Sequence, residues 1–111
     1  MLLAVRLYSS AILKSNQTSL RAYLNRAQCY LKLGKFYLAH EDAKKASELD
    51  PSSEKAFYRM AKAAYQMGEY VKAKQGFARC IELNASSDAA IIELDKTNER
   101  IKETELGEYN W

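Results

Sequence analysis

The sequence has 111 residues, of which 48% are apolar, and its formal net charge is +3. This length fits one small domain with a modest core, and the small charge gives no argument for nucleic acid as a partner. An apolar run of about 18 residues, which a membrane-spanning helix needs, does not occur.

Residues 2–14 predict an amphipathic helix, with Leu3, Leu7 and Tyr8 at helical spacing. The spacing of Ala4, Tyr8 and Ala11 returns later as Ala73, Phe77 and Cys80. Residues 1–19 therefore match the second helix of a repeat whose first helix is absent. We expect the chain to be a piece of a longer protein, and its uncovered first helix to support self-association through Leu3 and Leu7.

Residues 20–87 contain one unit written twice, because a shift of 34 residues superimposes Ala22 on Ala56, Gly34 on Gly68 and Ala39 on Ala73. A fixed period of this size indicates stacked helical units. Apolar residues recur at intervals of three and four in each half, a glycine ends the first helix, and polar residues with serine start the next. We expect helices at 19–33, 36–49, 53–67 and 70–83.

The matching small and aromatic positions predict the core. Its members are Tyr23, Ala27, Tyr30, Leu33, Phe36, Ala39, Ala46, Phe57, Ala61, Ala64, Tyr70, Ala73, Phe77, Cys80 and Leu83.

A sixth helix is expected at 87–105. Asp88 suits its first turn, where a negative charge meets the helix dipole. Ala90, Ile91, Leu94, Asn98 and Ile101 would form a narrow apolar stripe, with charged residues such as Glu93 and Lys96 on the opposite side. Such a helix is typical of the cap that closes a solenoid. We expect the chain to leave this helix at Gly107 and to continue as a tail over 107–111.

The repeated unit resembles the tetratricopeptide repeat. The matching residues are Tyr23, Ala27, Tyr30, Gly34, Phe36, Ala39, Ala46, Pro51, Phe57, Ala61, Gly68, Tyr70, Ala73, Phe77 and Cys80. The resemblance implies an all-α superhelix of helix-turn-helix repeats. Its parts would be the truncated repeat at 1–19, two full repeats at 20–53 and 54–87, a capping helix at 88–106 and a tail.

No nucleophile, histidine and carboxylate occur together at a catalytic spacing, and no glycine-rich phosphate loop or metal-ligand cluster is present. We therefore expect no enzyme activity, no cofactor and no metal. Cys29 and Cys80 are interpreted as buried free thiols in a reducing compartment, cytoplasmic or nuclear. The single histidine, His40, has no partner ligands nearby in the sequence.

Binding is expected on the first helix of each pair, which lines the inner surface of such solenoids. The predicted peptide-binding residues are Asn25, Lys55, Arg59, Lys62, Gln28, Tyr58 and Arg21. Their basic groups and amides suit an extended peptide with acidic groups.

Three of these residues also resemble the carboxylate clamp of tetratricopeptide co-chaperones, which holds the C-terminal carboxylates of the seventy- and ninety-kilodalton heat-shock chaperones. Asn25-Arg26-Ala27 fits the motif of the middle repeat, and Lys55 with Arg59 fits that of the next repeat. The remaining Lys and Asn of the clamp belong to the helix that this chain lacks. The resemblance implies an acidic peptide of the Glu-Glu-Val-Asp kind as the ligand.

Two alternatives remain open. The groove could hold an unrelated peptide or an internal segment, as a scaffold. Arg100 to Glu103 followed by Gly107-Glu108-Tyr109-Asn110-Trp111 also resembles the junction between such repeats and a SET-type lysine methyltransferase domain, which uses S-adenosylmethionine. In that case this segment would be the non-catalytic arm of a larger enzyme.

Overall fold

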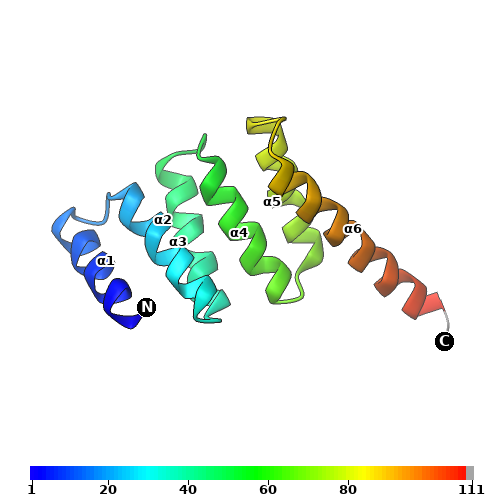
Figure 1. The fold of residues 1–111 in the computed structure, drawn as a ribbon, viewed down its shortest axis with the longest axis horizontal. Coiled ribbons are helices and arrows are strands. Elements are labelled where there is room, and N and C mark those ends of the chain that lie inside the picture. The colour runs from blue at the N-terminus through cyan, green and yellow to red at the C-terminus, as the bar shows by residue number, and fades with distance from the viewer. Residues whose placement is uncertain (110–111) are drawn as a thin grey trace.

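The computed structural model describes residues 1–109, and the side chains up to Glu105. It contains six helices, α1 (Leu2–Lys14), α2 (Leu20–Lys32), α3 (Phe36–Leu49), α4 (Glu54–Gln66), α5 (Tyr70–Leu83) and α6 (Asp88–Tyr109), and no strand within the described residues (Figure 1). The predicted bounds of the first five helices are correct to within one residue.

The predicted end of the last helix is wrong, because α6 continues through Gly107 to Tyr109. A glycine inside a helix costs only about 1 kcal/mol and does not by itself end it. The remaining tail residues, Asn110 and Trp111, lie outside the described part of the chain.

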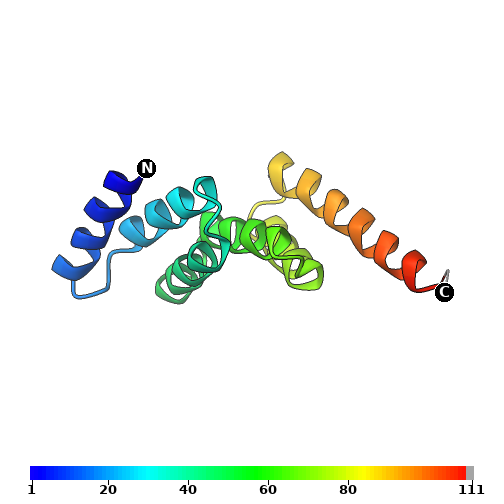
Figure 2. The same cartoon turned by 90° about the horizontal axis from the view of Figure 1, so that it is seen from below.

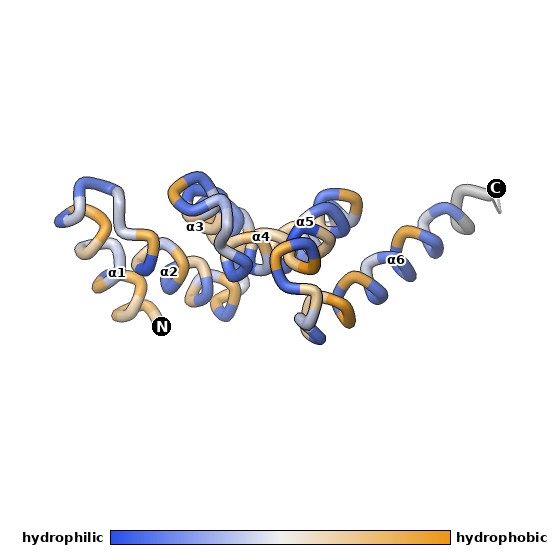
Figure 3. The backbone as a smooth tube through the Cα atoms, turned by 90° about the horizontal axis from the view of Figure 1, so that it is seen from above, coloured by the Kyte–Doolittle hydropathy of each residue, from blue (hydrophilic) through white to orange (hydrophobic). Residues whose placement is uncertain are grey.

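The helices stand side by side in chain order, with the two ends of the chain at opposite ends of the row (Figure 1). Each helix contacts the next one along the chain, and α2 also contacts α4. Seen at right angles to the view of Figure 1, the row of helices is curved (Figure 2). In this direction α3 and α5 lie on the same side of the row (Figure 3). The molecule is accordingly elongated, with extents of 53 × 29 × 19 Å.

The helix ends repeat with the same 34-residue period as the sequence. The side chains of Ser19 and Ser53 accept hydrogen bonds of 3.2 Å from the backbone N–H groups of Ala22 and Ala56, and each serves as an N-cap. Gly34 and Gly68 have φ angles of 75° and 79° in the turns between paired helices. Because this left-handed conformation is unfavourable for residues with a Cβ, glycine fixes where each hairpin turns.

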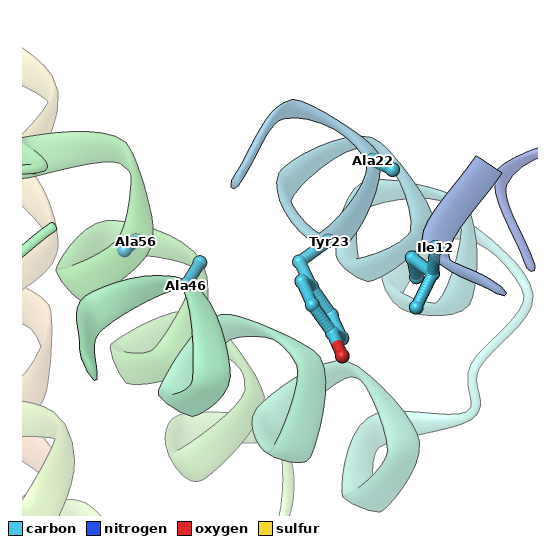
Figure 4. Close-up of a cluster of buried hydrophobic side chains, with 5 residues drawn as sticks. All are labelled: Ile12, Ala22, Tyr23, Ala46 and Ala56. Carbon is cyan, nitrogen blue, oxygen red and sulfur yellow. The ribbon is translucent and has the colours of Figure 1, made fainter. Parts of the chain in front are cut away.

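Small residues form most of the core. Of the predicted set, Tyr23, Ala27, Ala39, Ala46, Ala61, Ala64, Ala73, Phe77 and Cys80 are buried, whereas Tyr30, Leu33, Phe36, Phe57, Tyr70 and Leu83 are half-buried. Figure 4 shows Tyr23 between Ile12 of α1 and Ala46 of α3. Apart from Tyr23 and Phe77, the larger side chains of this set reach the surface.

The expected apolar stripe of α6 is partly wrong. Ala90 and Thr97 are fully buried, but Ile91 remains 39% exposed, and Glu93 lies against α4 rather than on the solvent side. The capping helix therefore rests on the array through small residues, the predicted stripe residue Leu94, which packs on the cluster around Phe77, and a charged pair.

The first full repeat contains a partly buried ion pair. Arg26 donates from Nε and Nη2 to the two carboxylate oxygens of Asp42, at 2.7 Å each, and from Nη1 to the hydroxyl of Ser9 at 3.0 Å. The hydrogen bonds from Arg26 to Asp42 raise the pKa of the guanidinium, against the opposing effect of burial. The pair links α1, α2 and α3, and the sequence pattern did not predict it.

The second repeat has no ion pair at the equivalent positions. Met60 and Gly76 occupy the positions of Arg26 and Asp42, 34 residues later. A Cβ on Gly76 would lie 2.7 Å from the Cβ of Ala61, so α5 approaches α4 more closely than a side chain would allow. The two repeats therefore share a backbone plan while one uses a charged pair and the other uses close backbone approach.

We expect Asp42→Ala to destabilise the protein by about 3 kcal/mol, because it leaves the partly buried Arg26 charge without its partner. The double variant Arg26→Met with Asp42→Ala, which removes both charges as the second repeat does, should recover most of this loss. Urea denaturation of the single and double variants measures both effects. A double variant no more stable than Asp42→Ala would contradict the interpretation.

We expect Gly76→Ala to lower the free energy of unfolding by about 1–3 kcal/mol, the usual cost of overpacking. Alanine has the higher helix propensity, so a stabilised protein would show that the close approach to Ala61 is absent. Gln75→Ala, on the exposed side of the same helix, is the matched control and should change stability little. Thermal and urea unfolding followed by circular dichroism provide the comparison.

The outer face of α1 is apolar and open. Leu2 and Leu3 are each 67% exposed and Leu7 is 62% exposed. We expect this face to make the chain self-associate at high concentration. In sedimentation experiments, Leu3→Glu with Leu7→Glu should shift the protein to a monomer, whereas Leu38→Glu on α3 should not. A wild-type chain that stays monomeric at millimolar concentration would contradict the prediction.

Candidate peptide-binding groove

Four neighbouring cavities follow the side of the row lined by α2, α4 and the start of α6. Each cavity shares lining residues with the next one along the row. Arg21 and Asn25 line both the first and the second cavity, and Lys55 and Arg59 line both the second and the third. Gln28 and Tyr58 line both the third and the fourth. Their volumes lie between about 270 and 420 Å³. Together they form one continuous surface, called the groove below, and all the predicted peptide-binding residues line it.

The repeat explains why these side chains meet. Positions one 34-residue period apart fall at the same place on α2, α4 and α6. One such row contains Asn25, Arg59 and Glu93. A second contains Arg21, Lys55 and Ala89, and a third contains Gln28, Lys62 and Lys96.

Asn25, Lys55, Arg59 and Arg21 line a single cavity of about 320 Å³ between α2 and α4. Asn25 is half-buried, whereas Arg21 and Lys55 are exposed. Among the described residues, neither of these exposed cations forms an ion pair with an acidic side chain. The predicted clamp residues are thus brought together, with two mobile charges at the rim and an amide within.

Arg59 is held more firmly than its neighbours. Its Nη1 donates a 2.8 Å hydrogen bond to the backbone carbonyl of Leu24, across the gap between α4 and α2. Burial lowers the pKa of its guanidinium. The bond leaves other N–H groups of the fork for a ligand while it fixes the plane of the guanidinium, so less side-chain freedom is lost on binding.

Gln28 and Tyr58 stand between the basic cavity and the α6 end of the groove. Both are half-buried, and the Tyr58 ring packs edge-on against Phe77 at 5.7 Å. Burial raises the pKa of the Tyr58 phenol, with a smaller contribution from the charge of Glu93. This part of the groove offers an amide, a phenol and an apolar ring face, and the exposed Lys32 lines the same cavity.

Lys62 lines the groove, but an acidic side chain on α6 opposes its charge. Its Nζ lies 3.7 Å from Oε1 of Glu93 on α6, and Lys96 approaches the same oxygen at 3.5 Å. The 34-residue spacing of Glu93 from Arg59 was the signal that could have placed this carboxylate in the groove.

A further cavity of about 320 Å³ lies beside α3, α4 and α5, away from the groove. Phe57, Met60, Ala61, Ala64 and Gly76 contribute to its lining, and His40, Lys72 and Arg79 stand at its rim. It opens where the second repeat has Met60 and Gly76 in place of the ion pair of the first. Nothing in its lining resembles a catalytic arrangement.

Other chemistry finds little support in the described residues. They hold no cluster of three metal-ligating side chains, and no helix among them is long and apolar enough to cross a membrane. Cys29 and Cys80 are buried free thiols, as predicted, and burial raises the pKa of Cys80 to about 12. A thiol with so high a pKa is a poor nucleophile.

Curated relatives match about half of this chain. Hsp70-Hsp90 organizing protein 3 of Arabidopsis thaliana is 52% identical over 54 residues, which cover 49% of this chain and 10% of that protein. The chain therefore spans only a small part of such relatives. The match confirms the resemblance to co-chaperone sequences.

Several solved structures have a fold similar to that of this chain. The first TPR of Spaghetti (RPAP3), bound to the HSP90 peptide SRMEEVD, has a TM-score of 0.85 at 26% identity and covers 88% of this chain and 77% of that one. The second TPR domain of human RPAP3, in complex with the HSP70 peptide SGPTIEEVD, has a TM-score of 0.80 at 32% identity, with coverages of 85% and 78%. The predicted all-α repeat fold is confirmed.

The family model described as "Anaphase-promoting complex, cyclosome, subunit 3" matches residues 1–80, which is most of the chain. The repeated hairpins, the glycine turns and the close-packed alanines supply the structural basis of that match. The chain belongs to this family of tetratricopeptide-repeat sequences.

Proposed function

We propose that the groove binds the acidic C-terminal end of a partner protein in an extended conformation, as a chaperone-binding module. The observation that carries this proposal is the single cavity lined by Arg21, Asn25, Lys55 and Arg59. Three cationic side chains and one amide converge there, and no acidic side chain lines the cavity.

The chemistry of these groups suits two carboxylates close together, as at the end of a chain that terminates in Asp. Asn25 can donate from its amide, Lys55 supplies a mobile point charge, and the Arg59 guanidinium supplies a planar fork whose orientation the Leu24 carbonyl holds. Charge-assisted hydrogen bonds of this kind are stronger than neutral ones.

The similar structures support the same choice of ligand. Two of them hold peptides ending in Glu-Glu-Val-Asp, which are the HSP90 and HSP70 peptides named above. The related Hsp70-Hsp90 organizing protein suggests the same partners for this chain. We infer a protein-interaction module without turnover of its own, acting in the compartment where those chaperones occur.

The scaffold alternative and the methyltransferase-arm alternative make different predictions. A scaffold for an internal segment would bind peptides with free and amidated C-termini equally well. A role as the arm of a SET-type enzyme depends on sequence after Trp111, and on no residue of the groove.

We expect Arg59→Ala to weaken binding of the peptide SRMEEVD by about ten- to a hundredfold, because a charge-assisted hydrogen bond contributes roughly 1.5–3 kcal/mol. Arg59→Lys should recover only part of the loss, since an ammonium cannot make the forked contact. The effect of Lys55→Ala should be smaller and should fall as salt is added. Calorimetric titration, with peptide up to millimolar concentration, measures all three.

The control is Lys44→Ala, which removes one exposed positive charge from α3. Circular dichroism should show that each variant keeps its helical content. Equal affinity for the free-acid peptide and its C-terminal amide would contradict the proposal, as would an Arg59→Ala variant that binds like the wild type.

A further inference from the structure

One row of equivalent positions changes from a cation on α4 to a carboxylate on α6. Glu93 occupies on α6 the position that Arg59 occupies on α4, 34 residues earlier. Its side chain is only 12% exposed, and its Oε1 lies 3.7 Å from Nζ of Lys62 and 3.5 Å from Nζ of Lys96. One carboxylate therefore stands between two lysines that would otherwise present free positive charge.

This arrangement has a direct consequence for a ligand. A carboxylate that approached Lys62 would have to displace Glu93 or remain beside it, and like charges placed side by side are unfavourable. The charge of Glu93 also reaches the phenol of Tyr58, whose pKa it helps to raise after the larger effect of burial. In the cavity shared by Tyr58, Lys62 and Gln28, Lys62 is thus a weaker partner for an acidic group than the exposed Lys32, which lines the same cavity.

We propose that Glu93 is a specificity-determining residue, which withholds Lys62 from acidic ligand groups. This inference rests on the proposed function of the groove. It predicts that an acidic ligand group gains nothing from Lys62 where the ligand passes α6. Discrimination arises here from a repulsive element added to an attractive site.

The test uses the intact chain and peptides derived from SRMEEVD. Each of the three residues before Glu-Glu-Val-Asp is replaced in turn by Glu and by Gln, and affinities are measured for the wild type and for Glu93→Gln. In the wild type, Glu should bind no better than Gln at the position that meets Lys62. In Glu93→Gln, Glu should bind about two- to fivefold more tightly than Gln at the position that meets α6, the range expected for a partly exposed ion pair.

Two further variants separate a local effect from a change in net charge. Glu99→Gln removes an exposed carboxylate from the same helix and should leave the peptide profile unchanged. Lys62→Ala in the Glu93→Gln background should abolish the gain for Glu-containing peptides. Without peptide, the Tyr58 phenol, followed by NMR with labelled tyrosine, should titrate at lower pH in Glu93→Gln than in the wild type.

The outcomes are distinguishable. If the wild type prefers the free-acid peptide to its amide but Glu93→Gln has the wild-type profile at all three positions, the role of Glu93 is overturned and the proposed function stands. If the wild type does not distinguish the free acid from the amide, the proposed function is overturned, and with it any part of Glu93 in choosing acidic ligands.

Discussion

The close approach of neighbouring helices at alanine is the contact on which the rest of this structure depends. Ala27, Ala39, Ala61 and Ala73 have at most 1% of their surface exposed. A methyl group at each of these positions brings two backbones close enough for the larger neighbours to pack around the contact. Because these alanines recur with the sequence period, each repeat is placed on the last in the same way, and equivalent positions of α2, α4 and α6 fall into line.

Within this common plan, the two full repeats solve the same packing problem with different chemistry. The first joins α2 to α3 with the partly buried pair of Arg26 and Asp42, which also reaches Ser9 on α1. The second omits side-chain atoms at Gly76 and lets α5 approach α4. A charged pair is expensive to desolvate, but it is specific in its partners, and here it ties the first helix to the array. The apolar solution leaves instead a cavity beside Met60.

The electrostatics of the groove follow from residues on helices that are distant in sequence. The positive cavity exists because Arg21 and Asn25 of α2 face Lys55 and Arg59 of α4. On α6, Glu93 opposes the charge of Lys62, the next lysine along α4. The formal net charge of +3 describes neither fact. The positive charges of the groove are therefore not equally available to a ligand.

Periodicity in the sequence was sufficient to determine the helices, their turns and the repeat architecture. The recurrence of Ala22 as Ala56 and of Gly34 as Gly68 reflects helix faces and turn conformation. Both are local properties, so they can be predicted without the tertiary structure. The same periodicity selected the residues that line the groove, because equivalent positions on stacked helices must share a face.

Only the tertiary structure decided which charges are available. Lys62 and Arg26 look like ordinary helix-surface cations in the sequence, yet one is opposed by Glu93 and the other is committed to Asp42. Arg59 likewise uses one N–H group of its guanidinium for a hydrogen bond to the Leu24 carbonyl. Hydrogen bonds and ion pairs between helices depend on distances of a few ångströms across the packing interface. Periodicity fixes the face on which a side chain lies, and the packing of α6 on α5, which brings Glu93 within reach of Lys62, determines what that side chain meets there.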